Sequence, residues 1–368
     1  MRISALETRV YRYPLDPPFL AAWDPKPRTH QDATIVVVRS DDGAEGYASG
    51  DGLPDRELLG ALIVGRDLGA GDVHEVIETV DFHHGRNWTL ELAVWDLLGR
   101  AAGEPVWRLL GGTSDRIGAY ASSGELVSAD ERVARCVALR DAGVRAVKLR
   151  LDSTDWRADL PVIAAVREAV GSGLEIMIDA NQAWRMPGDL TSRWSPAKVL
   201  ELARELERLD VYWLEEPLPT EDLDAYAELG RSTSLRIAAG EMVRTEAEAR
   251  ALVLSGGVDV VQVDVVLSGG VERARRMAAL AEEAGSSWSP HTWSNGYGLL
   301  ANLHAALAFS KSPYLEVPYD PPAWSTERRD WLLPTTIEIG DDGTIGPPPG
   351  PGLGVVPDFD SLEQYRIG

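Results

Sequence analysis

Three short apolar runs in the middle of the chain each end in a carboxylate. The run in IMIDAN ends at Asp179, YWLEEP closes on Glu215 and Glu216, and IAAGE closes on Glu241. Apolar runs of this length, separated by stretches of helical periodicity, are typical of parallel strands in an α/β protein. The carboxyl ends of such strands meet at one face of the sheet, so we expect the acids to converge there. Three convergent oxygen ligands favour a hard divalent cation, Mg²⁺ first and Mn²⁺ as the alternative.

Each of these acids has a second interpretation, taken alone. Asp and Glu also stabilise the N-terminus of a following helix, whether or not a metal binds. Repetition of the pattern in three consecutive units favours a shared metal site over three independent helix caps.

The composition bounds the class of protein. The chain has 368 residues, 44% of them hydrophobic and 26% charged, which suits one α/β barrel with a smaller appendage. The formal net charge of −22 argues against nucleic acid and anionic membranes as partners. The N-terminus lacks the layout of a signal peptide and Cys136 is the single cysteine, so we expect a cytoplasmic protein without disulfides.

The pattern of elements predicts two domains. Residues 1–115 form an α+β lobe, with two strand-like runs joined by a tight turn at Asp41-Asp42-Gly43 and helical patterns over 57–68, 72–80 and 90–103. Residues 116–331 repeat strand and helix in eight units, the count of a (β/α)₈ barrel or of a barrel with seven helices and an irregular last unit. Residues 332–368 contain a second Asp-Asp-Gly turn, and we expect this tail to return to the first lobe and complete it.

Polar residues close every predicted barrel strand. In chain order they are Ser122 and Ser123, Lys148 and Arg150, Asp179 and Asn181, Glu215 and Glu216, Glu241, Asp264, His291, and Glu316. A ring of polar groups at the carboxyl ends of barrel strands is where this fold keeps its active site. Asp264 and His291 come from neighbouring strands, and a carboxylate beside an imidazole orients its tautomer and raises its basicity. Lys148 and Arg150 lie two apart on one strand and share the interior face, where they must pair with carboxylates or an anionic substrate.

This order of residues resembles the mandelate racemase branch of the enolase superfamily. The motif is Lys-x-Arg on the second strand, then acids closing the third, fourth and fifth strands, then Asp and His closing the sixth and seventh. The resemblance covers essentially the whole chain, and it implies a modified (β/α)₈ TIM barrel with an α+β capping domain. Within the branch, the stretches PHTWSNGYG and LEVPYDPPAW are most similar to acid-sugar dehydratases and sugar-lactone cycloisomerases.

The resemblance implies roles for individual residues. Asp179, Glu215 and Glu241 would hold Mg²⁺, which would bind the substrate carboxylate, and Glu216 would not be a ligand. His291 would be the general acid/base with Asp264 as its partner, Lys148 would contact the carboxylate or enolate oxygen, and Glu316 would hydrogen-bond the carboxylate. Arg150 departs from the pattern, because it stands where the family has a second lysine that acts as a base. A guanidinium is a poor base and a good carboxylate clamp.

A single convincing base predicts an elimination rather than a racemisation, which normally needs a base on each face of the substrate. We expect a lyase that removes the proton alpha to a sugar-acid carboxylate and expels the β-hydroxyl, giving a 2-keto-3-deoxy acid. A cycloisomerase that opens a sugar-acid lactone or anhydro sugar acid is the alternative with the same residues. A metal-binding barrel without catalysis is the alternative of another class, and the Asp264, His291 and Glu316 set argues against it.

Loops of the capping domain should select the substrate, because they close over the barrel. The candidate substrate contacts are Trp23 and Lys26 in the segment 18–29, Asp51 in the GDGLPD loop, and Asn181 at the barrel itself. The alternative for each cap residue is an ordinary turn or surface position. By analogy with related barrels we also expect a homo-oligomer.

Overall fold

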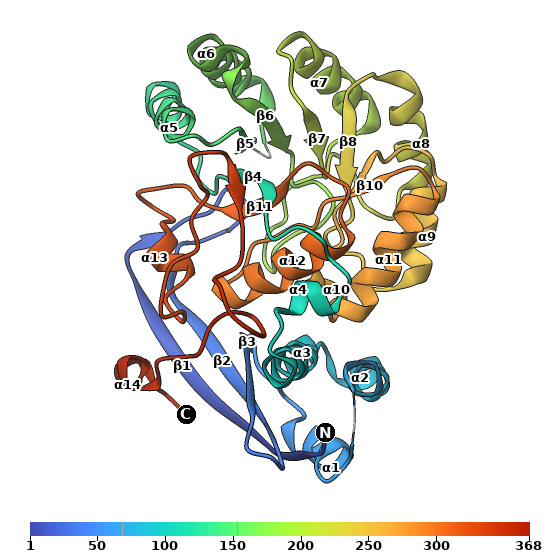
Figure 1. The fold of residues 1–368 in the computed structure, drawn as a ribbon. Coiled ribbons are helices and arrows are strands. Elements are labelled where there is room, and N and C mark those ends of the chain that lie inside the picture. The colour runs from blue at the N-terminus through green and yellow to red at the C-terminus, as the bar shows by residue number, and fades with distance from the viewer. Residues whose placement is uncertain (68, 153) are drawn as a thin grey trace.

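The N-terminal part of the chain folds into an antiparallel sheet that caps a barrel (Figure 1). The structure is a computed structural model and describes residues 1–67, 69–152 and 154–368. Strand β1 (Ile3–Phe19) pairs with β2 (Arg28–Ser40), and β2 pairs with β3 (Glu45–Gly50), both antiparallel. The predicted turn at Asp41-Asp42-Gly43 joins β2 to β3, and Gly43 adopts a φ of 87°, a conformation that favours glycine. The predicted hairpin is therefore confirmed.

Helices follow this sheet along the chain. They are α1 (Arg56–Ile63), α2 (Ala70–His84), α3 (Trp88–Ala102) and α4 (Val106–Leu109). Of these, α1 packs on β1 and α3 packs on β2 and β3. The predicted helix over 57–68 ends earlier, at Ile63, and position 68 lies outside the described residues. Helix α3 is buried along most of its length because it is wedged between β3 and the barrel. The contact is so close that a Cβ placed on Gly46 in β3 would lie 2.1 Å from the Ala93 carbonyl oxygen.

A curved parallel sheet forms the barrel. Its strands are β4 (Ile117–Ser122), β5 (Ala146–Arg150), β6 (Glu175–Asp179), β7 (Trp213–Glu215), β8 (Arg236–Ala239), β9 (Val260–Val261), β10 (Ser287–Trp288) and β11 (Leu315–Pro318). They pair side by side in chain order from β4 to β10, and β11 pairs with the other edge of β4. Each of the eight predicted strands is present. Several are shorter than their apolar patterns, β9 and β10 most of all.

Helices on the outside of the barrel alternate with these strands. They are α5 (Ala129–Asp141), α6 (Leu160–Val170), α7 (Pro196–Arg208), α8 (Leu223–Ser232), α9 (Glu246–Leu254), α10 (Val265–Ser268), α11 (Val271–Glu283) and α12 (Gly296–Phe309), with one-turn 3₁₀ helices η1 (Trp156–Ala158) and η2 (Gly171–Gly173) around α6. Ser195 caps α7 by accepting the amide of Lys198 at 3.3 Å, and Pro196 is the first residue of the helix. Cys136 is buried in α5.

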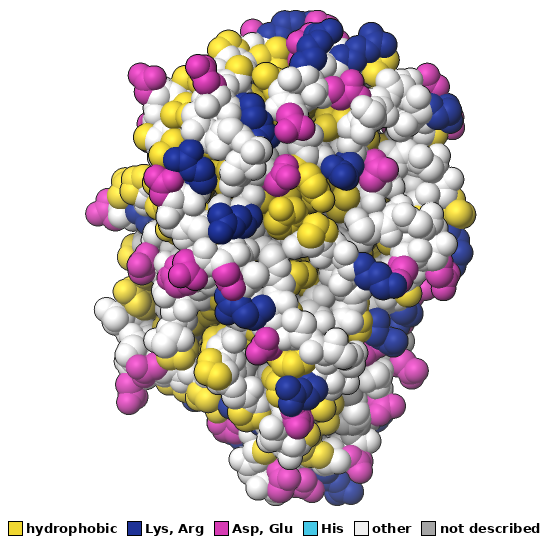
Figure 2. All heavy atoms as spheres, turned by 45° about the horizontal axis from the view of Figure 1, so that its top comes forward, with side chains coloured by type: hydrophobic (Ala, Val, Ile, Leu, Met, Phe, Trp, Pro, Cys, Tyr) yellow, Lys and Arg dark blue, Asp and Glu magenta, His cyan; other side chains and the backbone are white. Residues whose placement is uncertain are grey.

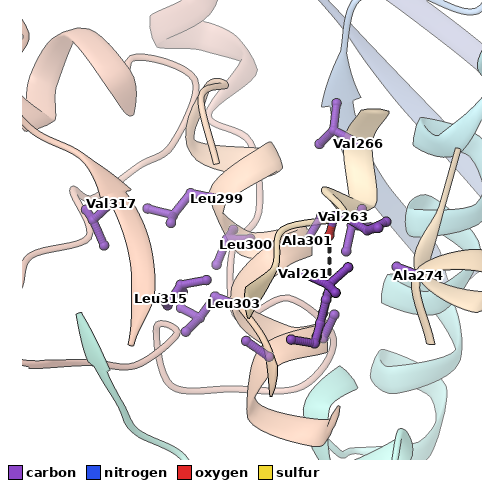
Figure 3. Packing of buried hydrophobic residues seen from close by; sticks show 14 of the residues in the cluster. Val261, Val263, Val266, Ala274, Leu299, Leu300, Ala301, Leu303, Leu315 and Val317 are labelled. Atoms are coloured by element: carbon purple, nitrogen blue, oxygen red, sulfur yellow. Dashed lines mark hydrogen bonds between the residues drawn. The ribbon is translucent and has the colours of Figure 1, made fainter. Parts of the chain in front are cut away.

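Side chains rather than a strand ladder join the last two barrel strands. Within the described residues no backbone ladder connects β10 to β11. Ser289 Oγ donates instead to the Tyr314 carbonyl at 2.7 Å, and the Thr292 amide donates to Glu316 Oε2 at 2.8 Å. Figure 3 shows how α12 fills this region, where its leucines lie between Val317 and Leu315 of β11 and Val261 of β9.

The C-terminal tail contacts both parts of the molecule. After β11 come the short helix α13 (Thr326–Arg329), which is the predicted irregular last unit, and strand β12 (Thr344–Ile345). The turn before β12 does not return to the first lobe, because β12 pairs with barrel strand β4. Beyond it, Gly352 bonds to Glu104 and Val106, helix α14 (Phe359–Leu362) and 3₁₀ helix η3 (Glu363–Tyr365) follow, and Val10 in β1 bonds to Ile367 and Gly368. Both termini lie at the cap end (Figure 1).

The surface carries charges of both signs. Figure 2 shows acidic and basic side chains interspersed over the face turned to the viewer, around a hydrophobic area near its middle. In the part of the chain that the structure describes, no helix is both long enough and apolar enough to cross a membrane.

Candidate active site

Three buried carboxylates meet at the carboxyl ends of neighbouring strands. Asp179 is the last residue of β6 and lies directly opposite Glu215, the last residue of β7, while Glu241 follows the end of β8. One oxygen from each of the three lies within 4.8 Å of the others. Glu216 takes another direction, because its Oε1 accepts the amide of Gly240 at 2.6 Å. The structure therefore brings together the three acids that the sequence singles out as metal ligands.

The chemistry of this group fits a hard cation. All three side chains are buried, and Glu241 Oε2 has no hydrogen-bond partner within the described residues. Burial raises the pKa of Glu215 to about 8 despite the nearby ammonium of Lys148, and burial also raises the pKa of Glu241. Negative charge is thus under-compensated here, and a divalent ion with oxygen ligands would supply the missing positive charge.

Lys148 lies at the centre of the carboxylates. Its Nζ is 2.7 Å from Glu316 Oε1 and 3.5 Å from Asp179 Oδ2, and it also contacts Glu215. The side chain is 0% exposed. Burial opposes its charge, but the carboxylates of Glu215 and Glu316 prevail and raise the pKa of Lys148 above its ordinary value. The Lys148 ammonium therefore stays protonated and supplies a positive charge at a fixed position among the carboxylates.

Most of the hydrogen bonds that the Arg150 guanidinium can donate go to neighbouring protein groups, which leaves few for a substrate. Its Nε donates to the Ser123 carbonyl at 2.8 Å, Nη2 donates to Ser122 Oγ at 3.0 Å, and Nη1 donates to Asp179 and, at 3.4 Å, to Asn181 Oδ1. Four of the five N–H groups of a guanidinium are thereby used. The remaining one cannot form a bidentate clamp on a carboxylate by itself.

His291 and Asp264 form the expected pair. The imidazole Nδ1 lies 3.0 Å from Asp264 Oδ2, and because the carboxylate is an acceptor, Nδ1 carries the proton. The other nitrogen, Nε2, lies 3.4 Å from Glu241 Oε2 and borders the cavity. Burial opposes charging of the ring, but Glu241, Glu316 and Asp264 raise the pKa of His291 to about 10.

Glu316 in β11 completes the ring of charged groups. Its Oε2 accepts the amide of Thr292, and its Oε1 faces Lys148. Burial alone would raise the pKa of this carboxyl, yet the positive charges of Lys148, His291 and Arg150 hold it at about 2. Glu316 is therefore a fixed negative charge opposite the ammonium.

A cavity of about 160 Å³ opens between these groups and the cap. Of the four predicted substrate contacts, Trp23 and Asn181 line it, whereas Lys26 is exposed and Asp51 lines a separate hollow beside Arg86. The other lining residues are Arg28, Arg150, Trp184, Met186, Glu241, Met242, Leu267, His291 and Trp293. Arg28 is already bonded to Asp24 through two hydrogen bonds of 2.6 and 2.9 Å. The wall away from the charged groups is mostly aromatic and apolar.

Several site residues escape the sequence analysis, among them Trp184 and Asn302, which bond to acids of the site. Trp184 in the loop after β6 donates from Nε1 to Glu241. Asn302 in α12 donates to Asp264 Oδ1 at 2.9 Å and accepts the Val265 amide at 3.0 Å. The signal for Asn302 is an amide inside the otherwise apolar pattern LLANLHAAL. The only sequence signal for Trp184 is its position, three residues after Asn181 at the polar end of a predicted strand.

The fold and the site define a barrel protein with a buried carboxylate triad beside a histidine–aspartate pair. Residues 131–361 match the family described as enolase C-terminal domain-like, and the chain belongs to this family. The resemblance to the enolase superfamily is thereby confirmed.

Relatives in the comparisons differ in their reactions. The arabinonate dehydratase of Saccharolobus solfataricus is 29% identical over 283 residues, which cover 75% of this chain and 71% of that protein. The D-galactarolactone cycloisomerase of Agrobacterium fabrum is 27% identical, and the match covers 100% of this chain and 99% of that protein. A racemase from Streptomyces coelicolor A3(2), crystallised with bound magnesium, has the same fold, with a TM-score of 0.82 at 24% identity over 99% of this chain and 100% of that one.

Proposed function

We propose that this protein is an acid-sugar dehydratase that removes the proton alpha to the carboxylate of a sugar acid and eliminates the β-hydroxyl. The observation that carries the proposal is the placement of His291. Its Nε2 borders the cavity beside the carboxylate triad, and Asp264 fixes its tautomer from the other side at 3.0 Å. The relatives that act on sugar acids support this substrate class.

Asp179, Glu215 and Glu241 would hold Mg²⁺ in this reaction. When bound, the ion supplies positive charge that offsets the negative charge developing on the substrate carboxylate. Lys148 adds a second fixed positive charge, and its enclosure by three carboxylates keeps it protonated. A proton on the carbon next to a carboxylate is hardly acidic, because its removal adds negative charge to a group that is already negative. The ion and Lys148 together would neutralise this added charge where it develops.

His291 moves the protons. Nε2 acts as the base when His291 is neutral, a form that a divalent ion on the triad would favour by offsetting the carboxylate charge of Glu241, which raises the pKa of the ring. Nε2 then takes the proton from the alpha carbon, the electrons of that C–H bond form the carbon–carbon double bond of an enol, and the bond from the beta carbon to its hydroxyl breaks. The same nitrogen then returns the proton to the departing hydroxyl, which leaves as water. The enol tautomerises to a 2-keto-3-deoxy acid. Lys148 and Arg150 stay charged and bonded to carboxylates, so neither is available as a second base for racemisation.

A cycloisomerase is the second candidate, and two observations favour it. The cycloisomerase from Agrobacterium fabrum matches the whole chain, whereas the match to the arabinonate dehydratase covers 75% of it. Indoles of Trp23, Trp184 and Trp293 line the cavity, and aromatic faces suit the C–H face of a sugar ring. In this reaction His291 would take the same proton, and the bond from the beta carbon to the ring oxygen would break. That oxygen would remain in the product, because its other bond to the carbon skeleton of the sugar stays intact.

A screen of the purified protein with Mg²⁺ against mono- and diacid sugars, their lactones and anhydro sugar acids tests the proposal. A 2-keto product lighter than its substrate by one water supports dehydration. A product of unchanged mass supports cycloisomerisation and overturns the first candidate. The variant His291→Asn should lose turnover by about a thousandfold or more while retaining Mg²⁺ binding, measured by calorimetry. Retained turnover in this variant would contradict the assignment of the base.

A further inference from the structure

One loop after β4 joins two parts of the site. On its barrel side, Ser122 Oγ and the Ser123 carbonyl accept the Nη2 and Nε hydrogen bonds of Arg150 at 3.0 and 2.8 Å. On its cap side, the Gly124 carbonyl accepts the amide of Ala22 at 2.7 Å. The segment 122–125 therefore fixes both the guanidinium in the barrel and the chain that carries Trp23.

Asp320, which follows β11, anchors this loop from outside the cavity. Its Oδ2 accepts the amides of Gly124 at 2.9 Å and Glu125 at 3.0 Å. Its Oδ1 accepts Nη1 of Arg132 at 3.0 Å and Nη1 of Arg135 at 2.9 Å, both from α5. The side chain is 2% exposed. Both oxygens are thus fully used within the protein, and two guanidiniums compensate the buried charge.

Aromatic side chains pack around the loop at the same point. The Asp320 backbone exchanges two hydrogen bonds, of 2.9 and 3.0 Å, with Trp324. The Trp324 ring lies 4.7 Å from Phe19 of the cap and 5.7 Å from Trp293. A Cβ on Gly124 would approach the Phe19 ring to 2.5 Å. Displacement of the loop would therefore move the aromatic contacts between cap and barrel.

The same contacts end at the cavity. The Trp23 ring meets Trp293 edge to face, with centroids 4.7 Å apart. The Arg150 guanidinium lies 4.5 Å from the Trp23 ring centroid. A chain of direct contacts thus runs from Asp320 through Gly124 and Ala22 to Trp23, and a parallel one runs through Ser123 to Arg150.

We propose that Asp320 is a positioning residue, which holds the segment 122–125 and through it sets both Arg150 and the Trp23 side of the cavity. Asp320 itself is not among the described residues that line the cavity. The effect on turnover rests on the proposed function, whereas the effect on the two segments does not. Sites of this kind need supporting groups that hold the contacting residues in place.

Amide hydrogen exchange read by mass spectrometry tests the positioning in the full chain. In Asp320→Ala, peptides covering residues 19–25 and 122–126 should exchange about tenfold faster or more, because the amides of Gly124 and Glu125 lose a charged acceptor. Asp96→Ala is the matched control. Asp96 is also buried, pairs with Arg100 at 2.8 Å and accepts two amides, from Tyr47 and Leu353, but it lies between α3, β3 and the tail. The control should leave both peptides within about twofold of the wild type.

Asp320→Asn keeps the volume and tests the same point if the alanine variant folds poorly. Its single oxygen can accept from the two amides or from the two arginines but not from both sets, so exchange should be intermediate between wild type and alanine. Unchanged exchange at 19–25 and 122–126 in both variants would overturn the positioning role.

Steady-state kinetics supply the second readout. With a substrate from the screen, Asp320→Ala should raise KM about tenfold and lower kcat less, because Trp23 lines the cavity in which the substrate would bind. Asp96→Ala should leave KM within about twofold. Faster exchange with unchanged KM would overturn the link to the cavity. If no sugar acid reacts at all, the proposed function fails while the exchange result still decides the positioning.

Discussion

Replacement of Lys148 by methionine tests whether the carboxylates depend on the buried ammonium. Methionine keeps an unbranched apolar stem and removes the charge. The side chain is completely buried, with Nζ 2.7 Å from Glu316 Oε1 and 3.5 Å from Asp179 Oδ2. At an effective dielectric constant of about 20, these two distances correspond to attractions of about 6 and about 5 kcal/mol. The cost of removing the ammonium and the carboxylates from water on folding offsets several kcal/mol of these attractions.

The net loss of unfolding free energy in Lys148→Met should therefore be about 3–5 kcal/mol without metal, the range for breaking a buried ion pair. Arg150 continues to compensate Asp179, which keeps the loss from exceeding this range. Mg²⁺ should reduce the difference from wild type, because a cation held by the triad compensates Asp179 and Glu215 in the place of the ammonium.

Urea denaturation in the presence of a chelator, and again with Mg²⁺, measures both effects. Lys311→Met is the matched control, because Lys311 is 74% exposed and pairs with Glu282 at the surface. The control should change stability by no more than about 0.5 kcal/mol in either condition. A Lys148→Met protein within about 1 kcal/mol of wild type in chelator would refute the reasoning that the ammonium is what makes this cluster of acids tolerable.

Two further predictions concern stability away from the cavity. Burial lowers the pKa of His304 to about 4, below its ordinary value of 6.5, so the unfolded chain binds this proton first as the pH falls. The contribution of the neutral ring to the free energy of unfolding is about 3 kcal/mol; it is complete above pH 6.5 and is lost as the pH falls from about 6.5 to about 4. The variant His304→Asn keeps an acceptor for the Trp107 amide. It should flatten this part of the plot of the urea midpoint against pH. Equal slopes in both proteins would contradict the assignment. Gly46→Ala should lower the free energy of unfolding by about 3 kcal/mol or more, measured by heat or urea, because its Cβ would lie 2.1 Å from the Ala93 carbonyl oxygen. Gly60→Ala in α1 is the control, since its Cβ meets nothing within 4 Å, and it should raise the free energy of unfolding by about 0.5–1 kcal/mol. An unchanged stability in Gly46→Ala would show that β3 can move away from α3.

The sequence predicts where the charged residues gather, for a physical reason. The carboxyl ends of barrel strands are placed by the strand ladder, so a residue such as Asp179 or Glu215 is located as soon as its strand is recognised. Register does the rest, since Lys148 and Arg150 must share a face with a period of two. Local pattern and global geometry coincide in this part of the chain.

The cap contacts follow no such rule. Lys26 and Trp23 lie three residues apart in one loop, yet only Trp23 lines the cavity, because the contacts of Phe19 and Ala22 with the barrel decide which way the loop faces. Asp51 lies on a different hollow for a similar reason. The gap between β10 and β11 is also invisible in the sequence, where SSWSPHT has the pattern of a full strand although only Ser287–Trp288 form a ladder. Long-range packing decides each of these cases.

The environment of Arg150 changes what the departure from the Lys-x-Lys pattern means. From the sequence, a guanidinium in this position reads as a clamp for the substrate carboxylate. In the structure its hydrogen bonds go to Ser122, Ser123, Asp179 and Asn181, and Nη2, which carries the single remaining N–H, lies 3.8 Å from Glu316 Oε1. A group bonded in this way contributes charge and orders its neighbours, while it neither accepts a proton nor grips a carboxylate with both arms. Recognition of an anionic substrate would then rest on Lys148 and on the triad with its ion. The stereochemistry of proton removal would rest on His291 alone, which is why an elimination that needs one base suits this site better than a racemisation that needs two.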